Sequence, residues 1–335
     1  MASKYQLISA LSERAAEDVT RSPLHWMGYL DTASRLYRYP FHEQLLIHAQ
    51  RPDATACASL ELWNNKMGRW VNRGAKGIAL IDDSTDLPRL KYVFDVSDTH
   101  PLERSREVYL WQLQKEDTQM LMEHLQDTYG IDSTANLSDC LYEVARVTVS
   151  ENLSDYMNKL AYAIDGSFLE DLDDLNLEVR FRELMTNSLH YTLVKRCGLD
   201  TSEIFEPMDF QNIYEFSTPM ALAQLGCAVS ETAMPILMDI GQKVRTMEIE
   251  KDSEISQNRL DKDSNVVYNN FTTLMRESAE REQDDNTEKG DVSDDEIGLH
   301  EQSELFDPEH SDGRARQQLS WTLREDAEDV SEGAS

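Results

Sequence analysis

The side chains best suited to chemistry lie near the N-terminus, where cations alternate with aromatic rings. Arg35 to Phe41 reads Arg-Leu-Tyr-Arg-Tyr-Pro-Phe, and more residues of both kinds follow between Arg51 and Lys76. Aromatic rings stack on unpaired bases for about 1 to 3 kcal/mol each, while Arg and Lys follow the phosphate backbone. This mixture favours binding of single-stranded nucleic acid.

A turn with two glycines, Arg73-Gly74-Ala75-Lys76-Gly77, points the same way. Glycine lets a backbone approach a phosphate closely, and here two cations stand beside it. The spacing does not match the phosphate-binding loop of nucleotide hydrolases. The turn is therefore a candidate contact for a backbone phosphate.

The same residues also fit a purely structural interpretation. Trp26, Phe41, Trp63 and Trp70 suit the core of a small domain, and the cations suit its solvated surface. Residues 21–80 hold 8 basic and 4 acidic side chains, a small local excess of positive charge. Composition alone favours this plainer interpretation, so the nucleic-acid hypothesis needs further support.

Catalytic and metal-binding sites are not predicted. His42 and His48 stand six residues apart, whereas a helical zinc motif needs two histidines four residues apart on one face. His190 and Cys197 have no partners for nucleophilic chemistry and are interpreted as packing residues of a helix. The acidic run at 171–174 lacks the glycine and the spaced ligands of a calcium loop. We expect no enzyme activity, no metal and no cofactor.

Periodicity and chain breakers predict the elements that position the N-terminal residues. Ser22-Pro23 is a strong helix start, and the residue before Pro40 is pushed out of the helical region. The predicted helices span 23–39, 41–50 and 60–67, and the predicted strands span 68–71, 78–81 and 92–96. Together they indicate an α+β unit in which helices cover a short antiparallel sheet.

The rest of the chain differs in composition. From Val108 to Ile249, apolar residues recur at helical spacing, which predicts an all-α region. Residues after about 250 are polar and acidic, so we expect a mostly disordered tail with a short helix at 266–276. The predicted organisation is a helix at 1–20, an α+β domain at 21–100, a helical domain at 105–250 and an acidic tail at 251–335.

The net charge of −31 argues against a polyanionic partner for the chain taken as a whole. However, the charge is unevenly distributed. Residues 1–100 hold 12 basic and 12 acidic side chains, while residues 251–335 hold 9 basic and 24 acidic ones. The objection therefore applies to the downstream regions and not to the N-terminal one.

Cysteine spacing and hydropathy predict where the protein works. The four cysteines stand far apart and form no Cys-x-x-C pair, which is typical of reduced thiols. Residues 1–11 lack the apolar region of a signal peptide, and no apolar run approaches the roughly 18 residues of a spanning helix. We expect a cytoplasmic protein without a membrane span.

Several short sequence motifs follow one another in the N-terminal region, and as an ordered series they are more specific than any one of them. Leu45 to Thr55 reads LLIHAQRPDAT, Trp63 follows, and Met67 to Leu80 reads MGRWVNRGAKGIAL. The series covers roughly a quarter of the chain and resembles the N-terminal domain of ArdC-type antirestriction proteins. The resemblance implies a module that binds single-stranded DNA and is carried by plasmids and conjugative elements. Such modules often lie at the front of large helicase and adenine-methylase polypeptides of Gram-positive bacteria. Three further segments also resemble the front end of such polypeptides, namely Tyr92 to Thr99, Arg196 to Asp200 and Phe210 to Leu225.

Two departures limit what the resemblance implies. The family commonly has Ser, Arg and Asn where this chain has Pro40, His42 and Glu43, which weakens the case for DNA contacts there. ArdC proteins also continue into a zinc-metalloprotease domain with an H-E-x-x-H helix, and this sequence has no such helix. Protease activity is therefore not expected.

The leading hypothesis is a non-catalytic single-stranded DNA-binding protein, or a fragment of one, from a mobile element that functions in conjugative transfer or antirestriction. The alternative is a protein-interaction module whose acidic helical region docks on restriction enzymes or transfer machinery. In the leading hypothesis, cations contact phosphates and aromatic rings stack on bases. The predicted contacting residues are Arg38, Tyr39, Phe41, Gln44, Arg51, Trp63, Arg69, Trp70, Arg73 and Lys76.

Overall fold

Three helices open the chain in the computed structural model, which describes residues 3–82 and 89–285. They are α1 (Lys4–Thr20), α2 (Pro23–Arg35) and α3 (Phe41–Gln50). The Ser22 side chain accepts a hydrogen bond from the His25 amide at the start of α2, as the sequence predicts. α2 ends earlier than predicted because a turn follows Arg35, in which the Tyr39 amide donates to the Leu36 carbonyl.

Five short strands follow in two antiparallel groups. β1 (Cys57–Ser59), β4 (Arg89–Asp95) and β3 (Ile78–Asp82) form a sheet in the order β1-β4-β3. β2 (Arg69–Val71) and β5 (Thr99–Pro101) form a separate ribbon. The three predicted strands are confirmed, whereas β1 and β5, each three residues long, were not predicted. The helical stretch expected at 60–67 contains a five-residue π-helix, Leu62–Lys66, and a 3-10 turn at Val96–Asp98 joins β4 to β5.

Helices α1 and α3 cover one face of the three-stranded sheet. Ile78, Leu80 and Val93 of the sheet pack with Leu46 and Ile47 of α3 in one buried cluster. This arrangement confirms the predicted α+β class with a small antiparallel sheet.

The outer edge of β3 is covered by a side chain of α3. The side-chain amide of Gln50 donates through Nε2 to the backbone carbonyl of Ala79 at 2.8 Å. Its Oε1 accepts from the backbone N–H of Ala79 at 2.9 Å. Both backbone groups of an edge residue are thereby paired, which prevents another strand from adding there.

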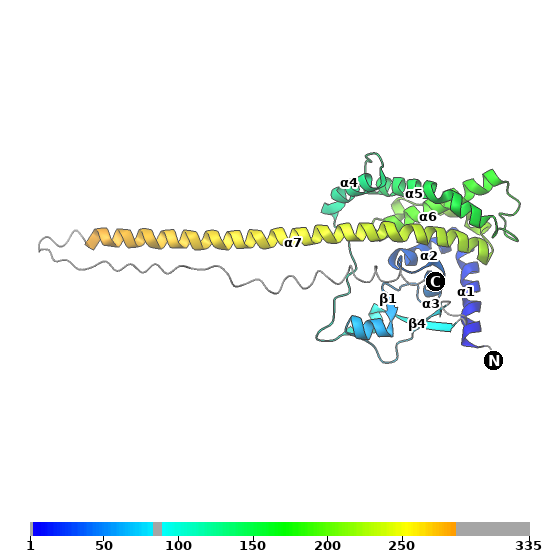
Figure 1. Cartoon of the computed structure of the whole chain (residues 1–335), viewed down its shortest axis with the longest axis horizontal. Coiled ribbons are helices and arrows are strands. Elements are labelled where there is room, and N and C mark those ends of the chain that lie inside the picture. Colours follow the sequence, from blue (N-terminus) through cyan, green and yellow to red (C-terminus); the bar gives the residue numbers. More distant parts are fainter. Residues whose placement is uncertain (1–2, 83–88, 286–335) are drawn as a thin grey trace, which may run out of the picture. The chain divides into compact units, whose positions relative to one another are not determined.

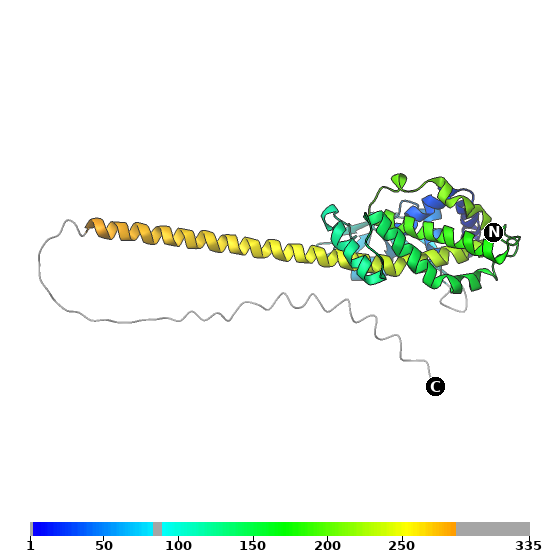
Figure 2. The same ribbon diagram turned by 90° about the horizontal axis from the view of Figure 1, so that it is seen from above.

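Helices make up the rest of the described chain. The long ones are α4 (Thr118–Tyr129), α5 (Leu137–Leu160), α6 (Asp174–Arg196) and α7 (Pro219–Asp285), with 3-10 turns at Lys115–Asp117, Thr201–Glu203 and Pro207–Glu215. Both views show α5, α6 and the first part of α7 running side by side (Figures 1 and 2). The predicted all-α region is confirmed.

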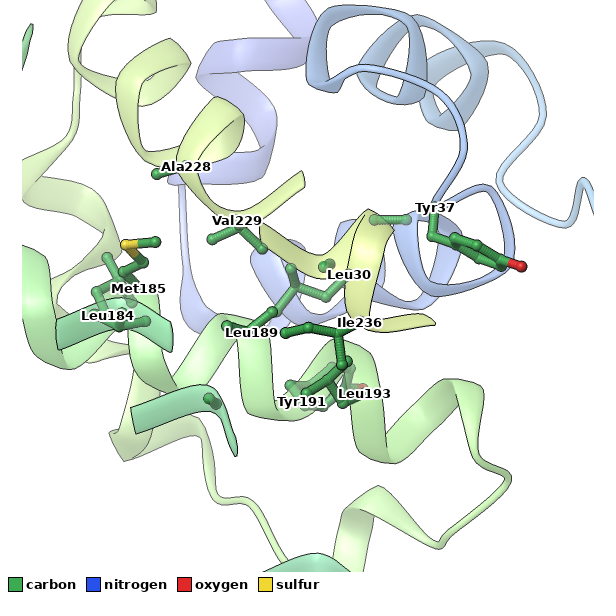
Figure 3. Close-up of a cluster of buried hydrophobic side chains, with 14 of the residues drawn as sticks. Leu30, Tyr37, Leu184, Met185, Leu189, Tyr191, Leu193, Ala228, Val229 and Ile236 are labelled. Atoms are coloured by element: carbon green, nitrogen blue, oxygen red, sulfur yellow. The ribbon is translucent and has the colours of Figure 1, made fainter. Parts of the chain in front are cut away.

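One hydrophobic core includes residues from both the N-terminal helices and the helical region. Figure 3 shows Leu30 of α2 beside Leu189 of α6 and Val229 of α7. Across the same contact, Trp26 Nε1 donates to Ser188 Oγ at 2.8 Å. The chain therefore has no break in its core at the boundary expected near residues 100–105, and Met1–Asp263 forms one compact unit.

Two glycines of α7 receive aromatic rings from earlier segments. A Cβ atom added at Gly226 would lie 2.1 Å from Phe41 Cδ2, and one added at Gly241 would lie 2.6 Å from Trp111 Nε1. The Trp111 ring also lies 3.5 Å from the Arg196 guanidinium, whose Nη2 donates to the Trp111 carbonyl. These contacts fasten α3 and the segment after β5 to α7.

The second compact unit, Ser264–Ser335, contains the last part of α7. The helix continues to Asp285, where the sequence indicated only a short helix at 266–276. Residues 242–285 contain no glycine or proline, which is compatible with an unbroken helix. The disorder predicted for the remainder of the tail concerns 286–335, which lie outside the described residues.

The Pro219–Ser253 part of α7 is long and apolar enough to cross a membrane, and no other helix among the described residues is. Within its most apolar window, 61% is buried inside the protein. A core helix passes the same test of length and composition, and the side chains of α7 in Figure 3 lie in the core.

Candidate nucleic-acid interface

The ribbon of β2 and β5 places two rings on one exposed face. Trp70 pairs with His100, while Arg69 pairs with Pro101 and Val71 with Thr99. Because side chains alternate along a strand, Trp70 and His100 share a face and Arg69 points to the other. The Trp70 side chain is 56% exposed and His100 is also exposed. A tryptophan this accessible, beside a second ring, suits stacking on a planar base.

The loop from β2 to β3 begins next to this pair. The side-chain Oδ1 of Asn72 lies 2.7 Å from Nδ1 of His100. The backbone N–H of Asn72 donates to the Asp98 carbonyl at 2.8 Å. The Ala75 amide then donates back to the Asn72 carbonyl at 3.0 Å, closing a turn. Gly74 has a φ of +88°, a conformation that side-chain-bearing residues rarely adopt. These hydrogen bonds and the conformation of Gly74 therefore define the backbone path of the turn.

Arg73 and Lys76 are both exposed on this turn. The turn ends at Gly77, which lies directly against β4: a Cβ there would be 3.1 Å from Phe94 Cζ and 3.3 Å from Tyr92 Cβ. A side chain at this position would press on Phe94 and Tyr92, so glycine suits the close approach of the loop to the sheet. Two exposed cations therefore lie on the turn that connects the Trp70–His100 ribbon to the sheet.

Tyr92 and His100 are candidate interface residues that were not predicted from the sequence. Tyr92 is 42% exposed, lies on β4 and contacts the end of the loop at Gly77. Side chains alternate along a strand, so a buried Val93 implies that the preceding residue, Tyr92, faces the opposite side of the sheet. His100 had no comparable signal, because its place depends on the pairing of the three-residue strand β5 with β2.

Three of the predicted contacting residues lie in the core, which corrects those predictions. The Phe41 ring packs against Gly226 of α7. The Gln44 amide accepts from Tyr29 Oη at 2.8 Å and donates to the Tyr39 carbonyl at 2.8 Å. Trp63 Nε1 donates to the Phe94 carbonyl at 2.8 Å from a buried ring. Their side chains stabilise the fold and are too buried to contact a DNA strand.

Three further predicted residues are partly buried and engaged within the fold. Arg51 forms an ion pair with Asp98 and donates through Nη2 to Ser97 Oγ at 2.8 Å. Tyr39 Oη donates to the Cys57 carbonyl at 2.8 Å, and burial raises the pKa of this phenol. Arg69 Nε donates to Thr99 Oγ1 at 2.9 Å, on the ribbon face opposite Trp70.

The remaining four predicted residues are exposed. The Arg38 guanidinium lies 5.9 Å from the centroid of the Tyr37 ring, in the turn between α2 and α3. Trp70, Arg73 and Lys76 lie together on the ribbon and its loop. We use the name ribbon surface for Trp70, Arg73, Lys76, Tyr92 and His100.

The residues considered for metal or nucleophilic chemistry do not converge. His42 is exposed beside Glu43, whereas His48 Nδ1 lies 2.8 Å from Thr32 Oγ1. His190 is buried, and its Nε2 donates to the Ser138 carbonyl at 3.0 Å. Across the described parts of the chain, no three His, Cys, Asp or Glu side chains are grouped to hold a metal ion.

Charge separates the ribbon surface from the rest of the molecule. Residues 1–107 contain 14 basic and 14 acidic side chains, whereas residues 108–250 contain 9 basic and 25 acidic ones. The helical part therefore repels an anionic strand, whereas the N-terminal part has no net charge to oppose one.

Comparison with known proteins adds nothing to this geometry. Neither a scan of protein-family models nor searches of curated proteins and solved structures give a match to this chain. The function is therefore argued from the residues of the ribbon surface.

Proposed function

We propose that the protein binds single-stranded DNA through the ribbon surface and has no catalytic role of its own. The observation that carries the proposal is the exposed Trp70, which is paired with His100 and followed by the exposed Arg73 and Lys76 on the next turn, in a chain of strongly negative charge. Bases of a single strand are free to stack on the rings, whereas bases of a duplex are already stacked. The resemblance to ArdC-type domains supports the same function.

The biological setting that fits is a mobile genetic element. A cytoplasmic DNA-binding accessory protein, or a fragment of a larger transfer polypeptide, would coat DNA that enters as a single strand during conjugation. Antirestriction is the activity after which the family that the sequence resembles is named. This setting is inferred from that resemblance.

The direct test is fluorescence anisotropy of a labelled oligonucleotide titrated with the full chain, in single- and double-stranded form. Single-strand binding that weakens with Trp70→Ala and with Arg73→Ala/Lys76→Ala supports the proposal. Each phosphate contact on a single strand contributes a slope of about −0.7 to log K against log salt, so the double variant should reduce the slope magnitude by about 1.4. Lys4→Ala/Arg14→Ala, two exposed cations of α1, and Tyr162→Ala, an exposed ring elsewhere, are the matched controls.

The proposal fails if the wild type shows no single-strand binding at low salt. It also fails if the α1 variant weakens binding as much as the loop variant. That second result would mean diffuse attraction by any cation of the N-terminal part and no defined interface.

A further inference from the structure

The connection between α5 and α6 presents large apolar side chains to solvent. Tyr162 is 86% exposed, Phe168 is 68% exposed, and Leu175 in the first turn of α6 is 72% exposed. Val179, four residues after Leu175, is exposed on the same face of α6. Burying a side chain of this size is worth about 1.5 to 3 kcal/mol, so several exposed together mark an interaction site.

These side chains are exposed on an ordered segment. Ala163, Ser167 and Leu169 of the same connection are buried and anchor it. The Ser167 amide donates to the Ile164 carbonyl at 2.9 Å, and the Gly166 amide donates to Glu170 Oε2 at 2.8 Å. The fold therefore holds Tyr162 and Phe168 outward at fixed positions.

The same segment is strongly acidic. Residues 161–178 contain six acidic side chains and neither lysine nor arginine. Asp173 caps α6 by accepting from the Asn176 amide, and Glu178 pairs with Arg182. Over the described ranges, Asp165, Asp171 and Asp174 form no ion pair with a lysine or arginine. Elsewhere acidic residues pair with lysines, as Glu43 does with Lys91.

We propose that this α5–α6 surface, residues 161–179, binds a protein segment that carries both basic and large apolar side chains, as a basic amphipathic helix does. The apolar side chains of the partner would be buried against Tyr162, Phe168, Leu175 and Val179. Its lysines and arginines would pair with the acidic rim, which sets the sign of the charge that the surface accepts. The inference goes beyond DNA binding and does not depend on it, because the surface lies in the helical part.

The test is anisotropy of a labelled amphipathic peptide made only of leucine and lysine, titrated with the full chain. Phe168→Ala/Leu175→Ser should weaken binding about tenfold, as expected when central apolar contacts are lost. Asp171→Asn/Asp174→Asn should weaken it as well and reduce its dependence on salt. Both variants change exposed residues, and their thermal melting should match that of the wild type.

Matched controls come from α4 and the 3-10 turn that precedes it, at the opposite end of α5 (Figure 1). Met120→Ala removes an exposed apolar side chain, and Glu116→Gln/Asp127→Asn removes two exposed acidic charges, and both should leave peptide binding unchanged. A peptide with serine for leucine and one with glutamate for lysine should each bind at least about tenfold more weakly.

Three results would overturn the proposal. In the first, the leucine-lysine peptide does not bind. In the second, Glu116→Gln/Asp127→Asn weakens peptide binding as much as Asp171→Asn/Asp174→Asn does. In the third, the serine-lysine peptide binds as tightly as the leucine-lysine peptide. The last two would mean that a highly acidic chain attracts any polycation. None of them bears on oligonucleotide binding, so the two proposals fail separately.

Discussion

Asp95 is the buried carboxylate that joins β4 to the segment after α3. Its Oδ2 accepts from the backbone amides of Thr55 and Ala56 at 2.7 and 3.0 Å, and its Oδ1 accepts from Ser97. Burial raises the pKa of Asp95, but the hydrogen bonds from Ser97, Thr55 and Ala56 outweigh it and the pKa lies below its usual value. The ionised carboxylate is therefore stabilised by the fold, and this contribution is lost as pH falls through the lowered pKa.

Replacing Asp95 with asparagine should lower the free energy of unfolding by about 1 to 3 kcal/mol, because an amide cannot accept from all of these donors. Urea denaturation at pH 7 measures the change. Asp53→Asn is the control, since Asp53 is exposed beside Arg51 and should change stability by less than about 1 kcal/mol. Equal effects of the two substitutions would contradict the role assigned to Asp95.

His190 should make the fold sensitive to mild acid. Burial lowers the pKa of His190 to about 4, although the Ser138 carbonyl favours the protonated ring. Because the pKa in the unfolded chain is higher, the stabilising contribution is complete above about pH 6.5 and is lost as pH falls toward 4.

We expect the wild type to lose up to about 3 kcal/mol more than His190→Gln between pH 7 and pH 4.5, since glutamine keeps a donor without titrating. Urea midpoints at the two pH values give this difference. His42→Gln, at an exposed site, should follow the wild type. Parallel curves for wild type and His190→Gln would rule out the effect.

At the scale of elements, helix α7 packs against aromatic rings from two earlier segments of the chain. Gly226 and Gly241 leave hollows on α7 into which Phe41 and Trp111 fit. α3 and the segment after β5 therefore depend on α7 for their positions. A side chain at either glycine would separate these elements.

Gly226→Ala should destabilise the protein by about 1 to 3 kcal/mol despite the better helix propensity of alanine, because the added methyl group overlaps the Phe41 ring. Gly28→Ala in α2 is a control in which nothing lies within 4 Å of the new Cβ, and it should stabilise by up to about 1 kcal/mol. Thermal unfolding compares them. The cost at Gly226 should shrink in a Phe41→Leu background, and a cost that does not shrink would exclude this contact as its cause.

The sequence predicted elements better than it predicted burial. Short apolar runs around Ile78 and Val93, separated by glycine-containing turns, were enough to predict the central strands, and Ser22-Pro23 was enough to predict the start of α2. Phe41 was predicted as a DNA contact because its neighbours are cations. Nothing within its own helix indicates the hollow at Gly226 that receives it, since long-range packing leaves no local pattern. The exposure of Trp70 was equally beyond reach, because it depends on which strand pairs with β2.

At the scale of the whole molecule, the DNA-binding region and the helical region share one core. Trp26, Leu30 and Phe41 are buried against α6 and α7 and would face water in a shorter chain. Residues 1–107 alone should therefore fail to fold cooperatively, while residues 1–253 should unfold in a single transition. Near-ultraviolet circular dichroism and a proton–nitrogen correlation spectrum of both fragments test this. A well-dispersed spectrum for residues 1–107 would show an autonomous domain instead.

The contact between Phe41 and Gly226 also has a consequence for synthesis on the ribosome. The hollow that receives the Phe41 ring is translated about 185 residues later, which at roughly 5 to 20 residues per second is a delay on the order of 10 to 40 seconds. During that time the nascent N-terminal helices carry uncovered aromatic surface. Newly made chains should thus depend on chaperones until α7 emerges, even though the finished protein covers these rings.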